Sequence, residues 1–254
     1  MRRCHPLELP CLTMHRDLPI AESHEPLLPI PSGKFSRFEP HPYQALGAPY
    51  GQASPWRLRQ GVLLALEQAQ AELANRHPGW RLKLFDAWRP LAVQAFMVWR
   101  EFAQQAAIQG LSLDGMDSPQ ALQQHSPEIY ARLAGAVFEF WSLPDEDPHH
   151  PPPHTTGAAV DLTLADAAGN EVPMGSPIDE VSPRSWPDHF ASAREPEARV
   201  FHAHRECLFS VMASAGFCRH PNEWWHFSLG DQMWAWQRGE GSARYGRWHE
   251  ATKI

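Results

Sequence analysis

The apolar residues of this chain recur at two spacings, and each spacing predicts one kind of element. Residues 54–76 place Leu, Val and Ala three or four positions apart behind a Ser-Pro start, which predicts an amphipathic helix. The same spacing predicts helices over 91–108, 127–141 and 195–215. The last of these helices is expected to bury one face, comprising Val200, His204, Cys207, Leu208, Val211, Met212 and Ala215.

Strands are expected where the pattern changes. "WRLKLFD" (80–86) alternates apolar and charged residues, while 158–164 and "EWWHFSL" (223–229) are rich in strand-forming residues. A long polar loop is predicted over 165–193. Because helices and strands do not alternate regularly, we expect an α+β fold rather than a doubly wound one.

The chain shows no internal repeat and no linker between two domains. Residues 1–55 are rich in Pro, His and Gly with little periodicity, so we expect an irregular arm there that either wraps the domain or is partly disordered. Residues 56–254 are expected to form a single domain. The four cysteines, Cys4, Cys11, Cys207 and Cys218, lack the spacing of a zinc knuckle.

Composition narrows the class of protein. The chain has 254 residues, of which 43% are hydrophobic and 20% charged, as in a globular protein with a substantial core. Its net charge of -7 disfavours a nucleic-acid partner, because binding to phosphates needs a basic surface. No apolar run is long enough to span a membrane, and the first residues lack the apolar core of a signal peptide. We therefore expect a cytoplasmic protein without a membrane partner.

The segment "PPPHTTGAAVDLTL", residues 151–164, places a carboxylate in a predicted strand. Aspartate is unfavourable in strands, and burying the carboxylate of Asp161 is costly unless its charge is compensated. An arginine could compensate it in a structural ion pair. A zinc ion could also do so, because His154 lies seven positions earlier and "NEWWHF" supplies His226.

Two further residues have the chemistry that a catalytic zinc site needs. A glutamate near the metal can move a proton from water to a leaving amine, and an arginine can stabilise the oxyanion of an attacked carbonyl. Glu223 and Arg89, the latter in "FDAWRP", are the candidates. Each residue could also have a purely structural role: Glu223 in an aromatic core strand, and Arg89 at the start of a helix. Glu223 and His226 can share a site only at a bulge, a twist or a strand end, because they would face opposite ways on an ideal strand.

Three motifs together resemble a known family. "HTTGAAVD", read as His-x-x-Gly-x-Ala-x-Asp, and the later Glu-x-x-His of "EWWHF" resemble zinc peptidases that act on D-amino-acid bonds. "DAWRP" followed by a predicted helix resembles their D-alanyl-D-alanine dipeptidase branch, which includes the enzymes of vancomycin resistance. The resemblance extends from about Leu58 to Phe227. It implies a compact fold with a central, mainly antiparallel sheet flanked by helices, shared with the amino-terminal domain of Hedgehog proteins.

The resemblance also implies a role for individual residues. His154, Asp161 and His226 would bind one zinc ion per chain, Glu223 would be the general acid/base, and Arg89 would stabilise the tetrahedral intermediate.

Other positions would shape the site. Gly157 would permit the turn between the two ligands of the first motif, and Ala159 would leave room for them. In "PMGSPIDEVS" the resemblance implies an acid that binds the amino terminus of the substrate, with Asp179 the first candidate and Glu180 the second.

One position departs from the family pattern. The family usually has a serine two residues before the first histidine, where its hydroxyl helps to hold the dipeptide. Here that position is Pro152, which has neither a hydroxyl nor a backbone donor, so the choice of dipeptide is affected and the zinc chemistry is not. His149 and His150, in the same proline-rich run, are expected to face solvent.

The expected function is a zinc dipeptidase that hydrolyses D-Ala-D-Ala or a related D-amino-acid dipeptide, with a small peptide as its partner. One alternative is a zinc carboxypeptidase or endopeptidase that trims longer peptidoglycan stem peptides. Another is a non-catalytic zinc-binding module of the same fold. The presence of Glu223 and Arg89 disfavours the module, because a structural zinc site requires neither.

Overall fold

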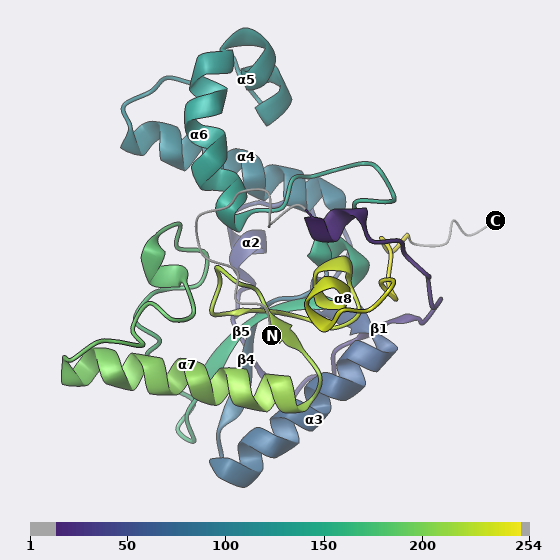
Figure 1. Cartoon of the computed structure of the whole chain (residues 1–254), viewed down its shortest axis with the longest axis vertical. Helices are drawn as coiled ribbons and strands as arrows, with labels where there is room; N and C mark the ends of the chain where they lie inside the picture. The colour runs from purple at the N-terminus through teal and green to yellow at the C-terminus, as the bar shows by residue number, and fades with distance from the viewer. Residues whose placement is uncertain (1–13, 250–254) are drawn as a thin grey trace.

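A five-stranded sheet lies at the centre of the protein, with helices around it (Figure 1). The computed structural model describes residues 14–249. In spatial order the strands are β2 (Ser36–Arg37), β4 (Arg81–Asp86), β5 (Ala159–Ala165), β7 (His226–Ser228) and β6 (Cys218–Arg219). β2 and β4 run parallel, and every other neighbouring pair is antiparallel. The mainly antiparallel sheet with flanking helices confirms the predicted α+β class.

The main hydrophobic core lies between the sheet and two long helices. α3 (Gln60–Arg76) and α7 (Pro196–Ser214) contact each other and bury apolar side chains in one cluster with those of the strands. β5 is buried along its whole length. Its Val160, Leu162 and Leu164 belong to this core, so the alternate residues of the strand face the opposite side of the sheet.

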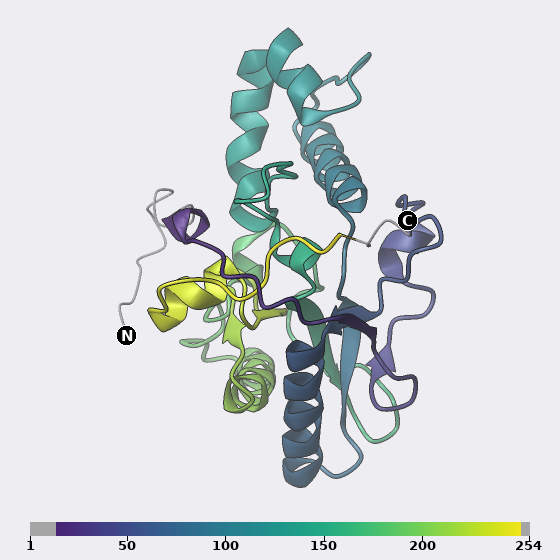
Figure 2. The same cartoon turned by 90° about the vertical axis from the view of Figure 1, so that its right-hand side faces the viewer.

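A second group of helices projects from the sheet, as Figure 2 shows at its top. α4 (Leu91–Ile108), α5 (Pro119–His125) and α6 (Pro127–Phe140) pack together around their own apolar cluster. Shorter elements complete the fold: η1 (Met14–Asp17), α2 (Pro42–Ala45), η2 (Pro153–Thr156), η3 (Pro183–Ser185) and α8 (Gln232–Arg238).

The helix predicted over 54–76 begins later than expected. Ser54 Oγ accepts a hydrogen bond from Trp56 N in a local turn, and β3 (Arg57–Arg59) then pairs with β1 (Leu27–Pro29) before α3 starts at Gln60. The apolar spacing predicted helix over residues 57–59 because the strand that pairs with them, β1, lies about thirty residues earlier in the chain. No periodicity indicated a strand there.

Other boundaries also differ from the predictions. β7 is shorter than "EWWHFSL", so Glu223 lies before the strand begins. It is therefore free of the strand alternation and can share a site with His226, as expected for a residue at a strand end. Val200 is 47% exposed rather than inward-facing, because the buried side chains of α7 begin only at Arg205. α5 was not predicted, although Ser118 caps it by accepting from Ala121 N.

The described part of the predicted arm, residues 14–55, lies against the rest of the domain. Ile30 and Phe35 enter the main core, and Tyr43 and Tyr50 enter the second cluster. Cys4 and Cys11 lie outside the described residues, and the boundary at residue 55 stays a prediction. No helix in the described part of the chain is both long enough and apolar enough to cross a membrane.

Candidate active site

The register of three neighbouring strands brings the first site residues together. Asp86 ends β4 opposite Asp161 on β5, and Asp161 lies opposite His226 at the start of β7. Side chains at paired positions of adjacent strands project from the same face of a sheet. Asp161 therefore points away from the main core and toward the two other residues.

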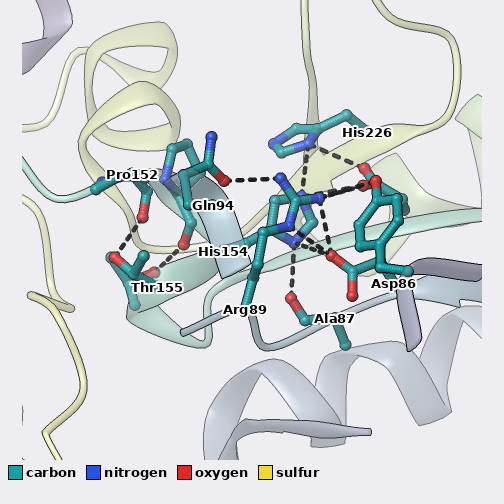
Figure 3. A network of polar contacts seen from close by, with 12 residues as sticks. Asp86, Ala87, Arg89, Gln94, Pro152, His154, Thr155 and His226 are labelled. Carbon is teal, nitrogen blue, oxygen red and sulfur yellow. Dashed lines mark hydrogen bonds and ion pairs between the residues drawn. The ribbon is translucent and has the colours of Figure 1, made fainter. Parts of the chain in front are cut away.

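His154 reaches the same point from η2, the turn before β5. Its Nδ1 lies 2.7 Å from the carbonyl oxygen of Ala87, which can only accept, so Nδ1 donates a proton to that oxygen and Nε2 is the nitrogen that faces the other site residues (Figure 3). Gly157 ends η2 in the left-handed conformation, with φ of 73°, and so provides the turn into the strand.

The three predicted ligands converge. His154 Nε2 lies 3.1 Å from an Asp161 oxygen and 3.2 Å from His226 Nδ1, which is 3.0 Å from the other Asp161 oxygen. All three side chains are buried, and these ligand atoms lie within 4.8 Å of one another. Within residues 14–249 this is the one cluster of its kind. Two imidazole nitrogens and a carboxylate form the donor set that zinc prefers, so the residues present fit a zinc ion.

Asp161 stays ionised in this buried position. Burial by itself would raise the pKa of the carboxyl, but the charge of His154 and the hydrogen bonds from His154 and His226 hold it well below its usual range. Arg89 contributes as well, with a guanidinium nitrogen 3.4 Å from the carboxylate. The two forms of compensation considered for Asp161, an arginine and a metal site, are thus both available.

Arg89 is fixed between β4 and α4 by side chains on three sides. Its Nε donates to Asp86 at 2.9 Å, one terminal nitrogen donates to Gln94 at 2.8 Å, and the other donates to the Tyr43 hydroxyl at 3.1 Å. The guanidinium also lies over the rings of Tyr43 and Trp141. It is 4% exposed, so its charge acts in a largely desolvated setting.

Asp86 anchors this arrangement. Besides Arg89, it accepts hydrogen bonds from His41 Nε2 and from the Tyr50 hydroxyl, both at 3.1 Å. Burial would raise the pKa of Asp86, but the charge of Arg89 and the bond from His41 lower it to about 2. Asp86 was not singled out from the sequence, although it stands in the same "FDAWRP" motif as Arg89 and could have been found there. His41 and Tyr50 were also missed, because no local pattern indicated them.

Glu223 lies beside the ligand cluster in the turn before β7. One of its oxygens is 3.8 Å from His226 Nδ1 and the other is 3.8 Å from His220 Nδ1. Burial raises the pKa of Glu223 well above its usual value, and the nearby charges of Asp161 and Asp179 raise it further. A carboxyl group with a raised pKa is a stronger proton acceptor, as a general base requires.

Asp179 comes from the long loop after β5 and is half-buried at the site. The Tyr43 hydroxyl donates to it at 2.8 Å. Burial, followed by the charge of Asp161, raises the pKa of Asp179 to about 7. Glu180, the second candidate, instead accepts a hydrogen bond from Ser182 within the loop and lies 3.6 Å from Arg184.

These residues line one cavity. The lining consists of Arg89, Gln94, Phe140, Trp141, Ser142, Pro153, His154, Asp161, Asp179, His220, Glu223, Trp225 and His226. All six predicted site residues are included, whereas Glu180 and Pro152 are not. His149 is exposed and His150 lies near Asp147, at 3.3 Å, outside the cavity.

Comparison with known sequences decides the family. The profile of the D-ala-D-ala dipeptidase family matches residues 36–242. The chain belongs to this family. It is 44% identical over 226 residues to the D-alanyl-D-alanine dipeptidase of Synechocystis sp., covering 87% of this chain and 88% of that protein. The predicted resemblance is confirmed.

More distant relatives carry the same name. The D-alanyl-D-alanine dipeptidase of Enterococcus faecalis is 29% identical over 175 residues, covering 68% of this chain and 73% of that protein. The one from Escherichia coli is 40% identical over 76 residues, covering 30% and 37%. As a D-ala-D-ala dipeptidase family member, the chain is a metallopeptidase, and the predicted enzyme class is confirmed.

Proposed function

We propose that this family member is a zinc-dependent dipeptidase that hydrolyses D-Ala-D-Ala or a closely related D-amino-acid dipeptide in the cytoplasm. The observation that carries the proposal is the convergence of His154, Asp161 and His226 on one buried point of a cavity that Glu223 and Arg89 also line. A site that only binds zinc for structural reasons needs neither a buried general base nor a buried cation.

His154, Asp161 and His226 would hold the ion. When bound, zinc would lower the pKa of a coordinated water and polarise the carbonyl of the substrate. Ala87 would have a supporting role, since its carbonyl would keep the proton of neutral His154 on Nδ1 and leave the lone pair of Nε2 for the ion.

Glu223 would move the proton. Its carboxylate takes a proton from the attacking water and returns it to the nitrogen of the leaving amino acid, so one residue serves as base and then as acid. Arg89 would stabilise the negative charge that develops on the carbonyl oxygen. Its three hydrogen-bonded partners keep the guanidinium oriented before the substrate arrives.

Asp179 would bind the amino terminus of the substrate. A half-buried acid in the lining of the cavity suits a free ammonium group, and Phe140 and Trp141 line the same cavity with apolar surface. These features favour a dipeptide over the longer stem peptides of the carboxypeptidase or endopeptidase alternative. Pro152 supplies no hydroxyl for the substrate, which leaves Asp179 as the main contact proposed for the amino end.

The test is an assay of purified protein on D-Ala-D-Ala, D-Ala-D-Ala-D-Ala and N-acetyl-D-Ala-D-Ala, before and after chelation. We expect hydrolysis of the free dipeptide, its loss on removing the metal, and its return with one zinc per chain. The blocked dipeptide and the tripeptide should be poor substrates. Preferred cleavage of the blocked or the longer peptide would contradict the dipeptidase assignment.

A further inference from the structure

Asp179 lies in a loop whose shape needs support from outside the loop. Residues 174–186 contain no regular element except η3. Asp179 itself has φ of 67°, a left-handed conformation that is unfavourable for a residue with a side chain. Such a conformation persists only where the surrounding structure holds it.

Arg205 of α7 provides that support. Its Nε donates to Met174 O at 2.7 Å, and one terminal nitrogen donates to Trp186 O at 2.9 Å. The other terminal nitrogen donates to Arg184 O at 2.9 Å and to Ser176 Oγ at 3.1 Å. These four acceptors lie at the two ends of the loop that carries Asp179, so one guanidinium ties both ends to the same helix.

The setting of Arg205 is unusual for a cation. It is completely buried, and within residues 14–249 no carboxylate oxygen lies within the 4.0 Å of an ion pair. Burial, with the like charges of Arg219 and Arg184, lowers its pKa to about 9, so it remains a cation at neutral pH. A buried charge is costly unless its donors are satisfied, and here the loop carbonyls and one hydroxyl satisfy them.

The same group connects the loop to the segment that carries Glu223. Trp224 donates from Nε1 to Ser176 Oγ at 2.9 Å and from its backbone nitrogen to Ser185 O at 3.0 Å. The Arg205 guanidinium lies 5.3 Å from the centre of the Trp224 ring. Ser176 Oγ therefore bonds both Arg205 and the residue that follows Glu223 in the chain.

We propose that Arg205 is a positioning residue that sets the preference of the enzyme for peptides with a free amino terminus. It does so by fixing residues 174–186, and thereby the place of Asp179 relative to the ligand cluster. The inference rests on the proposed function, because it assigns Asp179 to the amino group of the substrate.

Two substitutions test the proposal at different strengths. Arg205→Lys keeps the charge but cannot reach all four acceptors, and Ser176→Ala removes only the hydroxyl that links Arg205 with Trp224. Ser210→Ala is the matched control, because Ser210 lies on the same helix but bonds Arg76 outside the loop. D-Ala-D-Ala is compared with propionyl-D-Ala, which has the same shape at the scissile bond but no amino group.

We expect Arg205→Lys to raise KM for D-Ala-D-Ala with kcat within a few-fold of the parent. The ratio of kcat/KM for the two substrates should fall by about ten- to hundredfold, the range for losing a hydrogen bond to a charged group. Ser176→Ala should change the ratio in the same direction by less, and Ser210→Ala should leave it unchanged. Zinc content should stay at the parent value in all three.

Hydrogen exchange over residues 174–186 gives a readout that does not depend on activity. We expect faster exchange there in Arg205→Lys and Ser176→Ala, and parent-like exchange in the strands that carry the ligands. Folded variants with an unchanged ratio of kcat/KM and unchanged exchange would overturn the proposal. If Arg205→Lys does not fold, the result for Ser176→Ala alone decides whether the proposal stands. If the parent cleaved neither substrate, the proposed function and the specificity role would fail together, while exchange would still show whether Arg205 holds the loop.

Discussion

Asp161 shows how a strand can contain a buried carboxylate. Arg89 lies 3.4 Å away, and the facing nitrogens of His154 and His226 lie 3.1 and 3.0 Å from its two oxygens. The arginine sits between Asp161 and Asp86 and bonds both carboxylates. Replacing Arg89 should therefore affect turnover, whereas replacing a metal ligand should affect zinc binding.

Glu223 is the residue whose loss should separate metal binding from turnover. We expect Glu223→Gln to keep the fold and its zinc, because the amide has nearly the same shape and Glu223 is not one of the ligands. Turnover should fall by about 10²–10⁴-fold, the usual contribution of general acid–base transfer. Kinetics with metal analysis measures both, with Glu180→Gln as a control acid outside the cavity. A Glu223→Gln variant within a few-fold of the parent would remove this residue from the mechanism.

Arg89 should matter most in the transition state. Losing one donor to a developing oxyanion costs about 10²–10³-fold in kcat, so Arg89→Ala should lower kcat more than it raises KM. Arg89→Lys retains the charge but cannot bond Asp86, Gln94 and Tyr43 together, and should recover only part of the loss. Steady-state kinetics on D-Ala-D-Ala distinguishes the cases. An effect confined to KM would make Arg89 a group that binds the carboxylate of the substrate.

Asp86 should contribute to stability in a pH-dependent way. Its pKa of about 2 in the folded protein lies below the ordinary 3.8, so ionised Asp86 stabilises the fold by about 2 kcal/mol above pH 4. That contribution is lost as the pH falls from 4 to 2. Asp86→Asn should therefore be less stable than the parent at pH 7, and the difference should shrink over this window. Denaturant unfolding at several pH values measures it, and a constant difference from pH 7 to pH 2 would refute the assignment.

At the scale of elements, η2 and its terminal glycine decide how His154 meets β5. Gly157 has φ of 73°, and a methyl group there would collide with the side chain of Leu27. Gly169 has a similar φ of 87° but open space around the added carbon, so it provides a matched control.

Gly157→Ala should therefore weaken zinc binding as well as the fold. The left-handed backbone alone costs about 1–2 kcal/mol with a side chain, and Gly169→Ala should show only that loss of stability. Gly157→Ala should add a lower affinity for zinc, because relieving the collision moves the turn that carries His154. Thermal unfolding and zinc titration of both variants test this. Equal zinc affinity in the two variants would show that the turn does not position the ligand.

The sequence predicted the long elements and the motif residues, and missed what distant segments contribute. The helix over 91–108 coincides with α4, since a sustained apolar period leaves little choice of structure. β3 was misread as helix because its pairing with β1 is non-local. Tyr43 and Tyr50 reach the site from a segment without periodicity, so no local pattern could have indicated them.

For the molecule as a whole, the two ends of the described chain are fastened behind the site. Ala21 N donates to Ala243 O and Ala243 N donates to Pro19 O, so the amino- and carboxyl-terminal segments lie side by side. Arg59 bonds Thr156 O in η2, the Glu22 carboxylate near the start of the described chain and Gly246 O near its end. Through Arg59, the turn that carries His154 is thus linked to both ends of the described chain.

The central claim is that His154, Asp161 and His226 form a zinc site, and zinc content per chain tests it most directly. The parent protein is compared with the three single alanine variants and with His220→Ala, which removes a buried histidine of the same cavity that is not among the ligands. The account predicts one zinc per chain in the parent and in His220→Ala, and loss of the metal in each ligand variant. Stoichiometric zinc in all three ligand variants would contradict it.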